Sequence, residues 1–170
     1  MTWEHLVEEA TKKAGLVWLD LPGTGPRPAW HVWHDDAAYV VTGGLEQPLP
    51  GLLGLAQVVV TVPSKDNRSR IVSWRADCVR LAPGSDDWNA AVPVLVAGRL
   101  NLPDGQAAPD RWARESAVVR LVPTGEVLDW PGRAPLGSGA APPPLTPATT
   151  VGRLPGMLGR RRRRRRPSSP

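Results

Sequence analysis

Two consecutive glycines after a run of apolar residues are the first feature of the sequence that could bind a ligand. Thr42-Gly43-Gly44 follows directly on the stretch 37–41, which reads as a β-strand. Glycine adopts positive φ angles without steric cost, so a glycine pair can turn backbone N–H groups toward an anion such as a phosphate. A tight turn without a ligand explains the same residues, and both interpretations stay open.

A second candidate anion site is the polar turn at residues 64–70, which follows another β-branched run. It holds Lys65, Arg68 and Arg70, with serine hydroxyls close by in the sequence. A lysine supplies a point charge, and an arginine can give a phosphate two parallel hydrogen bonds. The alternative is a solvated hairpin loop.

The histidines and aspartates of residues 31–36 resemble a metal site only at first sight. On a β-strand, positions i and i+3 point to opposite faces, so His31 and His34 would not converge on one ion. We predict no metal site, and we expect His31 either to pack or to contact a ligand from the sheet.

Covalent catalysis has little support. The chain has no G-x-S-x-G motif, and its single cysteine, Cys78, lies in an apolar strand pattern typical of a structural thiol. The catalytic residues, if any, are therefore left unassigned. One cysteine allows no disulfide within the chain, and the sequence shows neither a signal-peptide pattern nor a long apolar segment. We expect a cytoplasmic protein without a transmembrane segment.

Charge divides the chain into two parts. Residues 1–130 hold 12 Lys+Arg and all 16 Asp+Glu, a net charge of −4, whereas residues 131–170 hold nine Arg and no acid, a net charge of +9. The second part also has nine Pro and six Gly, a composition typical of disorder. We predict a folded domain over 1–130 and a disordered tail over 131–170. The run Arg160–Arg166 could bind nucleic acid or an anionic surface weakly and without sequence preference, or it could be an accessory tail.

The remaining patterns predict the elements that must position these residues. Helical spacing of apolar residues indicates a helix at 3–14, and a second helix follows Ser85. Residues 109–115 read as a short turn. Strands are expected at 16–21, 28–34, 37–42, 57–63, 70–82 and 117–122. The predicted fold is mainly β (α+β): a six-stranded antiparallel split β-barrel with an N-terminal helix and one inserted helix, since a closed sheet leaves no free edges.

This order of elements resembles the pyridoxamine 5′-phosphate oxidase-like superfamily of FMN-binding split β-barrels, and within it the small actinobacterial members. The most telling stretch is 25–42, GPRPAWHVWHDDAAYVVT, in which a polar turn links a strand bearing Pro and Trp to a strand ending in Thr. The resemblance implies a homodimeric oxidoreductase with FMN, or a deazaflavin coenzyme, in a groove between subunits.

The resemblance also assigns cofactor-binding residues by position. Thr42, Gly43 and Gly44 match the segment near the flavin phosphate, and Lys65 and Arg70 could add charge from the next turn. Trp30 and His31 lie on the strand that typically lines the flavin ring, and Arg27, just before that strand, completes the set.

One segment departs from the family pattern. Flavin-binding members usually carry Lys or Arg shortly after that threonine, whereas residues 45–50 here contain Glu46 and no base. A carboxylate beside a phosphate is unfavourable unless a cation screens it. Three interpretations stay open: Lys65 takes the place of the missing base, the ligand is different from FMN, or the pocket is vestigial. The alternative function is a non-catalytic dimeric split-barrel module without cofactor, whose arginine run attaches to nucleic acid.

Overall fold

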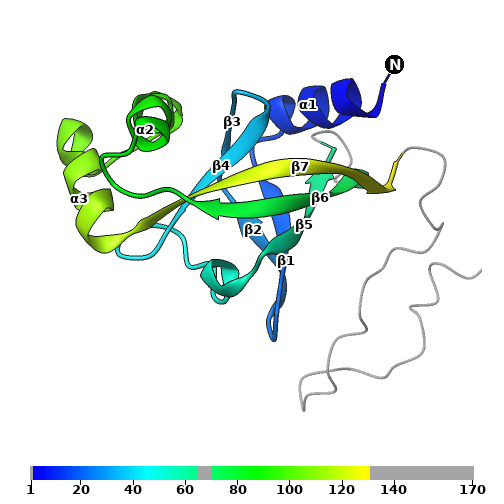
Figure 1. Cartoon of the computed structure of the whole chain (residues 1–170), viewed down its shortest axis with the longest axis horizontal. Helices are drawn as coiled ribbons and strands as arrows, with labels where there is room; N and C mark the ends of the chain where they lie inside the picture. The colour runs from blue at the N-terminus through cyan, green and yellow to red at the C-terminus, as the bar shows by residue number, and fades with distance from the viewer. Residues whose placement is uncertain (1, 65–69, 131–170) are drawn as a thin grey trace, which may run out of the picture. The chain divides into compact units, whose positions relative to one another are not determined.

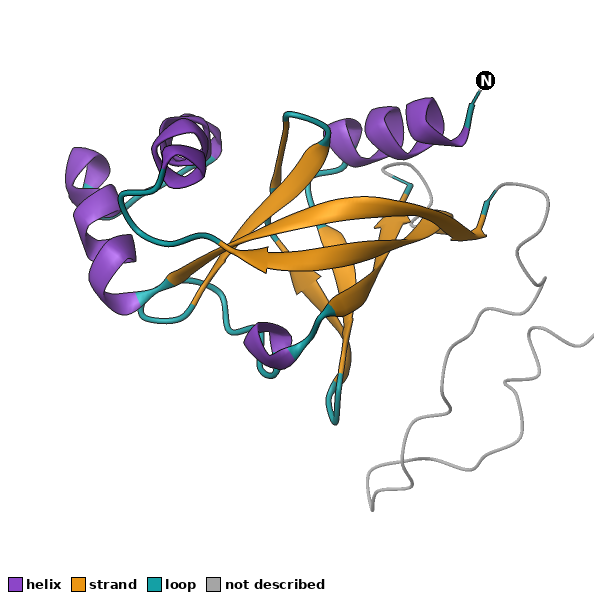
Figure 2. Cartoon of the chain, in the orientation of Figure 1, coloured by secondary structure: helices purple, strands orange, loops and turns teal. Residues whose placement is uncertain are grey.

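The computed structural model of the protein describes residues 2–64 and 70–130 (Figure 1). The turn with Lys65, the predicted tail 131–170 and its arginine run lie outside the described residues. The described chain forms one antiparallel sheet with helices gathered at two places: α1 on one side, and α2 with α3 together at the other end (Figure 2). The helices are α1 (Trp3–Lys13), α2 (Asp86–Gly98) and α3 (Ala108–Glu115), with short 3₁₀ turns η1 (Leu52–Gly54) and η2 (Gly105–Ala107).

The sheet has seven strands in the order β2-β1-β5-β6-β7-β4-β3, and every neighbouring pair is antiparallel. The two edge strands, β2 and β3, are consecutive in the sequence and are separated only by Trp30 and His31. This connection brings the two edges of the curled sheet together, as a split barrel requires. The strands are β1 (Val17–Leu21), β2 (Gly25–Ala29), β3 (Val32–His34), β4 (Ala37–Thr42), β5 (Gln57–Pro63), β6 (Arg70–Arg80) and β7 (Ala117–Asp129).

The predicted mainly β, antiparallel fold is confirmed, but the strand count is seven instead of six. The predicted strand at 28–34 is two strands, β2 paired with β1 and β3 paired with β4. Pro26 and Pro28 cannot donate ladder hydrogen bonds, and they sit on the edge strand β2, where proline is tolerated. The last strand, β7, also runs past its predicted end at residue 122 as far as Asp129.

The inserted helical segment contains two helices where the sequence predicted one. Ser85 caps α2 by accepting a hydrogen bond from the Trp88 N–H, as expected. Residues 109–115, predicted as a turn, belong to α3, which has proline in its first turn and fully buries Trp112. The local pattern is too short and too charged to distinguish this helix from a turn. Its stability comes from the tertiary burial of the indole, which no local pattern shows.

Buried apolar residues form two separate clusters, one on each face of β4, which is buried along its whole length. The barrel interior contains side chains of α1, β1, β4, β5 and β6 around Trp74, with Leu19, Val60 and Val40 fully buried. The helical layer packs α2 and α3, through Trp88 and Trp112, on the outer face of β4 and β7. Among the described residues, no helix is long and apolar enough to cross a membrane.

Candidate functional site

The double glycine lies where β4 ends, and the hydrogen bonds of the loop fix its shape. The Thr42 hydroxyl donates to the Gln47 carbonyl and accepts from the Leu49 N–H, each at 3.0 Å. Gly43 and Gly44 have φ angles of 91° and 59°, a region that glycine enters freely and other residues avoid. The Thr42 hydroxyl is therefore engaged in holding its own loop.

Both glycines also pass close to the junction between α3 and β7. The Ser116 hydroxyl donates to the Gly43 carbonyl at 3.0 Å. A Cβ atom at Gly44 would lie 3.1 Å from the Glu115 carbonyl oxygen and 3.2 Å from Ser116 Oγ. Close packing of backbone against backbone is thus one physical reason for glycine here, as the tight-turn interpretation expects.

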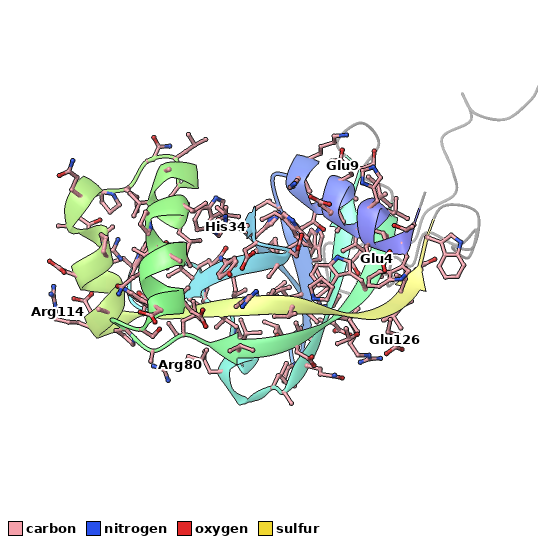
Figure 3. All side chains as sticks on the ribbon, turned by 45° about the horizontal axis from the view of Figure 1, so that its top comes forward. Glu4, Glu9, His34, Arg80, Arg114 and Glu126 are labelled. Carbon is pink, nitrogen blue, oxygen red and sulfur yellow. The ribbon has the colours of Figure 1, made fainter. Side chains whose placement is uncertain are left out.

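A pocket of about 410 Å³ opens beside this turn. Gly43, Ser116 and Leu53 contribute to its lining, together with two arginines from different elements, Arg80 at the end of β6 and Arg114 in the last turn of α3. Figure 3 shows both guanidinium groups at the same end of the molecule. Both side chains are exposed, and neither makes a hydrogen bond or ion pair with the described part of the chain.

Sequence reasoning missed Arg80 and Arg114 as site residues. A usable signal existed for the first. If the predicted strands 70–82 and 117–122 pair antiparallel, the end of the first strand lies beside the start of the second. The second strand begins directly after α3, so this pairing brings Arg80 close to the end of that helix. The pair Arg80 and Val119 shows this register. The same pocket includes Glu115, so the described residues of its lining supply two cations and one carboxylate.

Glu46, the acid that is unfavourable for an anion site, does not line this pocket and is buried in the helical layer. Its carboxylate accepts hydrogen bonds from Arg111 at 3.1 Å and from the Trp112 indole at 2.9 Å, and it lies 3.4 Å from Arg99. Arg111 also binds Asp104 through two hydrogen bonds, at 2.7 and 3.0 Å. We call the four charged residues Glu46, Arg99, Asp104 and Arg111 the Glu46 cluster.

The Glu46 cluster has no net charge. It fastens the loop of residues 43–49, which we call the glycine loop, to both helices of the helical layer. The Arg111 hydrogen bonds lower the pKa of the Asp104 carboxyl, and Asp104 together with Glu46 raises the pKa of Arg111. Since the Glu46 N–H also donates to the Gly43 carbonyl at 3.0 Å, the cluster holds the loop that borders the pocket. The carboxylate that departs from the family pattern is screened by two arginines.

Trp30 and His31 form the short link between the edge strands. Trp30 contacts the same loop, and His31 contacts α1. The Gln47 side chain bridges both backbone groups of Trp30, and the Arg99 guanidinium lies 5.1 Å from the Trp30 ring centre. His31 is buried, and its Nε2–H donates to the Thr11 carbonyl at 2.9 Å. Burial lowers the pKa of His31, so the imidazole packs against α1 in its neutral form.

Of the remaining predicted cofactor residues, Arg27 does not line the pocket beside the glycine turn. Arg27 is exposed on the edge strand β2, opposite Leu19. Arg70 begins β6 and Arg80 ends it; at about 3.3 Å per residue these two backbone positions lie on the order of 30 Å apart. Lys65 lies outside the described residues. The described members of the predicted set are therefore spread over the chain, and their joint role stays a prediction.

The described residues offer neither a reactive thiol nor a metal site. Burial raises the pKa of the half-buried Cys78 thiol to about 11, so it is protonated at neutral pH and a poor nucleophile. Within residues 2–64 and 70–130, no three His, Cys, Asp or Glu side chains come close enough to hold a metal ion.

Comparison with known proteins adds evidence on the fold. No protein-family model matches the chain, and no curated protein matches it in sequence. Among solved structures, HutZ, the heme storage protein from Vibrio cholerae, matches with a TM-score of 0.52 and 14% identity over 75% of this chain and 94% of HutZ. The chain has the fold of the pyridoxamine 5′-phosphate oxidase-like split barrels. The fold that the sequence resemblance implied is thereby confirmed.

Two other solved structures are similar to this split barrel. The protein Atu2129 from Agrobacterium tumefaciens has a TM-score of 0.50 and 15% identity, over 73% of this chain and 54% of that protein. A candidate pyridoxamine 5′-phosphate oxidase from Corynebacterium glutamicum has a TM-score of 0.48 and 15% identity, over 75% of this chain and 91% of that protein.

Proposed function

We propose that this split barrel binds a flavin-type cofactor, FMN or a deazaflavin coenzyme, with the cofactor phosphate in the pocket beside Gly43. The observation that carries the proposal is the pair of exposed guanidinium groups, Arg80 and Arg114, that line this pocket. The described acids in the lining do not cancel their positive charge completely. Arginine gives phosphate two parallel, charge-assisted hydrogen bonds. Glu115 in the lining reduces the positive charge but leaves an excess of one cation.

The residues present fit the phosphate end of such a cofactor better than its ring. The pocket volume of about 410 Å³ lies within the range of small-molecule sites. Its apolar lining includes Leu49 and Leu53 but no indole. When bound, the cofactor would supply the redox chemistry, and the protein would orient it and exclude water.

A homodimer belongs to the same proposal. Leu45, Leu53 and Val79 are exposed by 71%, 52% and 44%, and Leu53 lines the pocket while Val79 precedes Arg80. A second copy that covers these side chains would enclose the cofactor ring and bury apolar surface. The substrate and the direction of the redox reaction stay outside this proposal.

The test is a titration of the full-length protein with FMN, followed by quenching of tryptophan fluorescence. Hydrogen bonds to charged groups contribute about 1.5–3 kcal/mol each, so Arg80→Ala combined with Arg114→Ala should weaken FMN binding at least about tenfold. Lys13→Ala, which removes an exposed charge on α1, is the matched control and should leave the affinity unchanged.

A parallel variant separates the pocket from the set that the family resemblance assigns. Arg27→Ala should change FMN affinity little, since Arg27 does not line the pocket. If Arg27→Ala loses FMN affinity and the Arg80→Ala/Arg114→Ala variant retains it, the phosphate is bound by the residues that the family resemblance assigns and not by this pocket. Absence of FMN and deazaflavin binding by the unmodified protein would refute the proposed function.

The second candidate function is a non-catalytic module, and the structure of the loop after β4 favours it. The hydrogen bonds of the Thr42 hydroxyl and the close approach of Gly44 to Glu115 are both explained by the fold, without a ligand. If this candidate is correct, the purified protein is colourless, stays so after addition of either flavin, and still forms a dimer by analytical ultracentrifugation.

A further inference from the structure

A second pocket, distinct from the one beside Gly43, lies between α1, the β3–β4 turn and β7. Its volume is about 360 Å³, and its lining is mainly apolar. The indoles of Trp3 and Trp33 contribute to it, as does the buried side chain of Val7 on α1. The described lining also supplies three carboxylates: Glu4, Glu8 and Asp36.

Both indoles of this pocket are held in place by the fold. Trp33 packs edge-on against Trp74 of the barrel interior, with ring centres 6.1 Å apart and ring planes at 79°. Strand β7 passes directly beside Trp3, since a Cβ atom at Gly125 would lie 3.5 Å from its ring. Trp3 is nevertheless 37% exposed. Aromatic rings that the fold has already fixed lose little conformational freedom when a ligand binds to them.

The carboxylates give the pocket an excess of negative charge. Glu4 and Asp36 are exposed, and neither makes a hydrogen bond or ion pair with the described part of the chain. Figure 3 shows Glu4 on α1. Glu8 binds Lys12 on the next turn of α1, and this hydrogen bond, followed by the charge of Asp36, raises the pKa of Lys12. Three carboxylates against one ammonium group leave two negative charges among these residues.

Indoles and carboxylates together select a flat organic cation. The ring quadrupole of an indole attracts a cation, and carboxylates accept its charge-assisted hydrogen bonds. A guanidinium group suits both better than an ammonium group does, because its plane stacks on aromatic rings and its N–H groups match a carboxylate in pairs. We propose that this pocket binds a small guanidinium compound through Trp3, Trp33, Glu4 and Asp36.

The size of the pocket favours a free small molecule as the ligand. A volume of about 360 Å³ lies at the lower end of the range for small-molecule sites, which suits a compound about as large as one amino acid. The proposal does not depend on flavin binding, because the two pockets share no lining residue.

The test is a titration of the full-length protein with butylguanidinium, followed through the NMR signals of the tryptophan indole N–H groups. Trp3→Phe and Trp33→Phe assign the two signals. Both should shift and saturate by about 10 mM, since a cation of this size allows a dissociation constant of about 1 mM. Butylurea has nearly the same shape without the charge and should bind at least about tenfold more weakly.

The carboxylates are tested by Glu4→Gln combined with Asp36→Asn, which should weaken butylguanidinium binding at least about tenfold. Asparagine tolerates the φ of 54° at position 36 as aspartate does, so the turn is preserved. The matched control, Asp20→Asn combined with Asp110→Asn, removes two exposed carboxylates elsewhere and should leave the affinity unchanged.

The aromatic contribution is tested by Trp3→Leu, which keeps an apolar side chain at the exposed start of α1. The loss of one indole should weaken binding about threefold, measured on the Trp33 signal.

Unmoved Trp3 and Trp33 signals at the highest butylguanidinium concentration would overturn the proposal. So would equal affinities for butylguanidinium and butylurea, or an unchanged affinity in the Glu4→Gln/Asp36→Asn variant. An arginine peptide blocked at both ends that binds more tightly than butylguanidinium would assign the pocket to an arginine side chain of a protein partner, and would overturn the small-molecule ligand.

Discussion

The barrel interior and the helical layer are held together by different forces, although they share strand β4. The barrel interior consists of apolar side chains around Trp74, whose main stabilisation is the burial of apolar surface. The helical layer adds the Glu46 cluster, which joins α2 and α3 to the glycine loop through buried ion pairs. The comparison shows that the sheet specifies the fold, whereas the charged layer specifies the shape of the loop beside the candidate phosphate site.

The largest effect should come from breaking the barrel interior. Trp74 is 1% exposed and packs edge-on against Trp33, with ring centres 6.1 Å apart. Trp74→Ala should lower the free energy of unfolding by about 3–5 kcal/mol, because it leaves a large cavity inside the curled sheet. Urea denaturation measures this loss. Leu100→Ala, at a position that is 81% exposed, should change stability by less than about 0.5 kcal/mol. Equal losses in the two variants would contradict the assignment of the interior.

The next effect should come from the Glu46 cluster. Glu46→Gln keeps an acceptor for the Trp112 indole but leaves buried Arg111 with one carboxylate fewer, and it should cost about 2–4 kcal/mol. Glu115→Gln, an exposed carboxylate near the same loop, is the control and should be nearly neutral. If both variants unfold at the same urea concentration, charge does not stabilise the helical layer.

This contrast explains how much of the fold could be predicted from the sequence. The strand at Gln57–Pro63, the N-terminal helix and the start of α2 after Ser85 depend on neighbours in the chain, so they were predicted correctly. The split at Trp30 and His31 was missed, because it depends on which distant strand each half pairs with.

The site was less predictable for the same reason. Glu46 was treated as an obstacle to an anion, since its partners Arg99 and Arg111 are more than fifty residues away in the sequence. Arg80 and Arg114 belong to separate elements that meet only through the pairing of β6 with β7. Short-range patterns carry no information on such meetings.

A smaller effect should appear where the helical layer touches the glycine loop. Gly44→Ala combines a φ of 59° with a Cβ 3.1 Å from the Glu115 carbonyl oxygen. It should cost about 1–3 kcal/mol by urea denaturation. Gly15→Ala, where an added Cβ meets nothing within 4 Å, is the control. A Gly44→Ala protein as stable as the control would show that the loop is not held against α3.

The smallest effect is a pH dependence at the contact of α1 with the barrel. Burial lowers the pKa of His31 below its ordinary value of 6.5, so the unfolded chain binds a proton more readily than the folded one. The stability from neutral His31 is complete above about pH 7 and is lost as the pH falls through 6.5 toward the lower folded pKa. The Asp104 carboxyl, with its lowered pKa, begins to lose its contribution only below its ordinary value of 3.8.

Thermal unfolding between about pH 7.5 and 5 measures the His31 term. His31→Gln, whose amide can still donate to the Thr11 carbonyl, should remove most of the dependence in this range. An unchanged pH profile in His31→Gln would place the responsible group elsewhere.

³¹P NMR of FMN shows whether the pocket beside Gly43 binds the phosphate of a flavin-type cofactor through Arg80 and Arg114. With the full-length protein in excess, we expect a shifted and broadened phosphorus signal, which returns to its free position in the Arg80→Ala/Arg114→Ala variant but not in Lys13→Ala. A phosphorus signal that the unmodified protein leaves at its free position, or that the double variant still shifts, would contradict phosphate binding by this pocket.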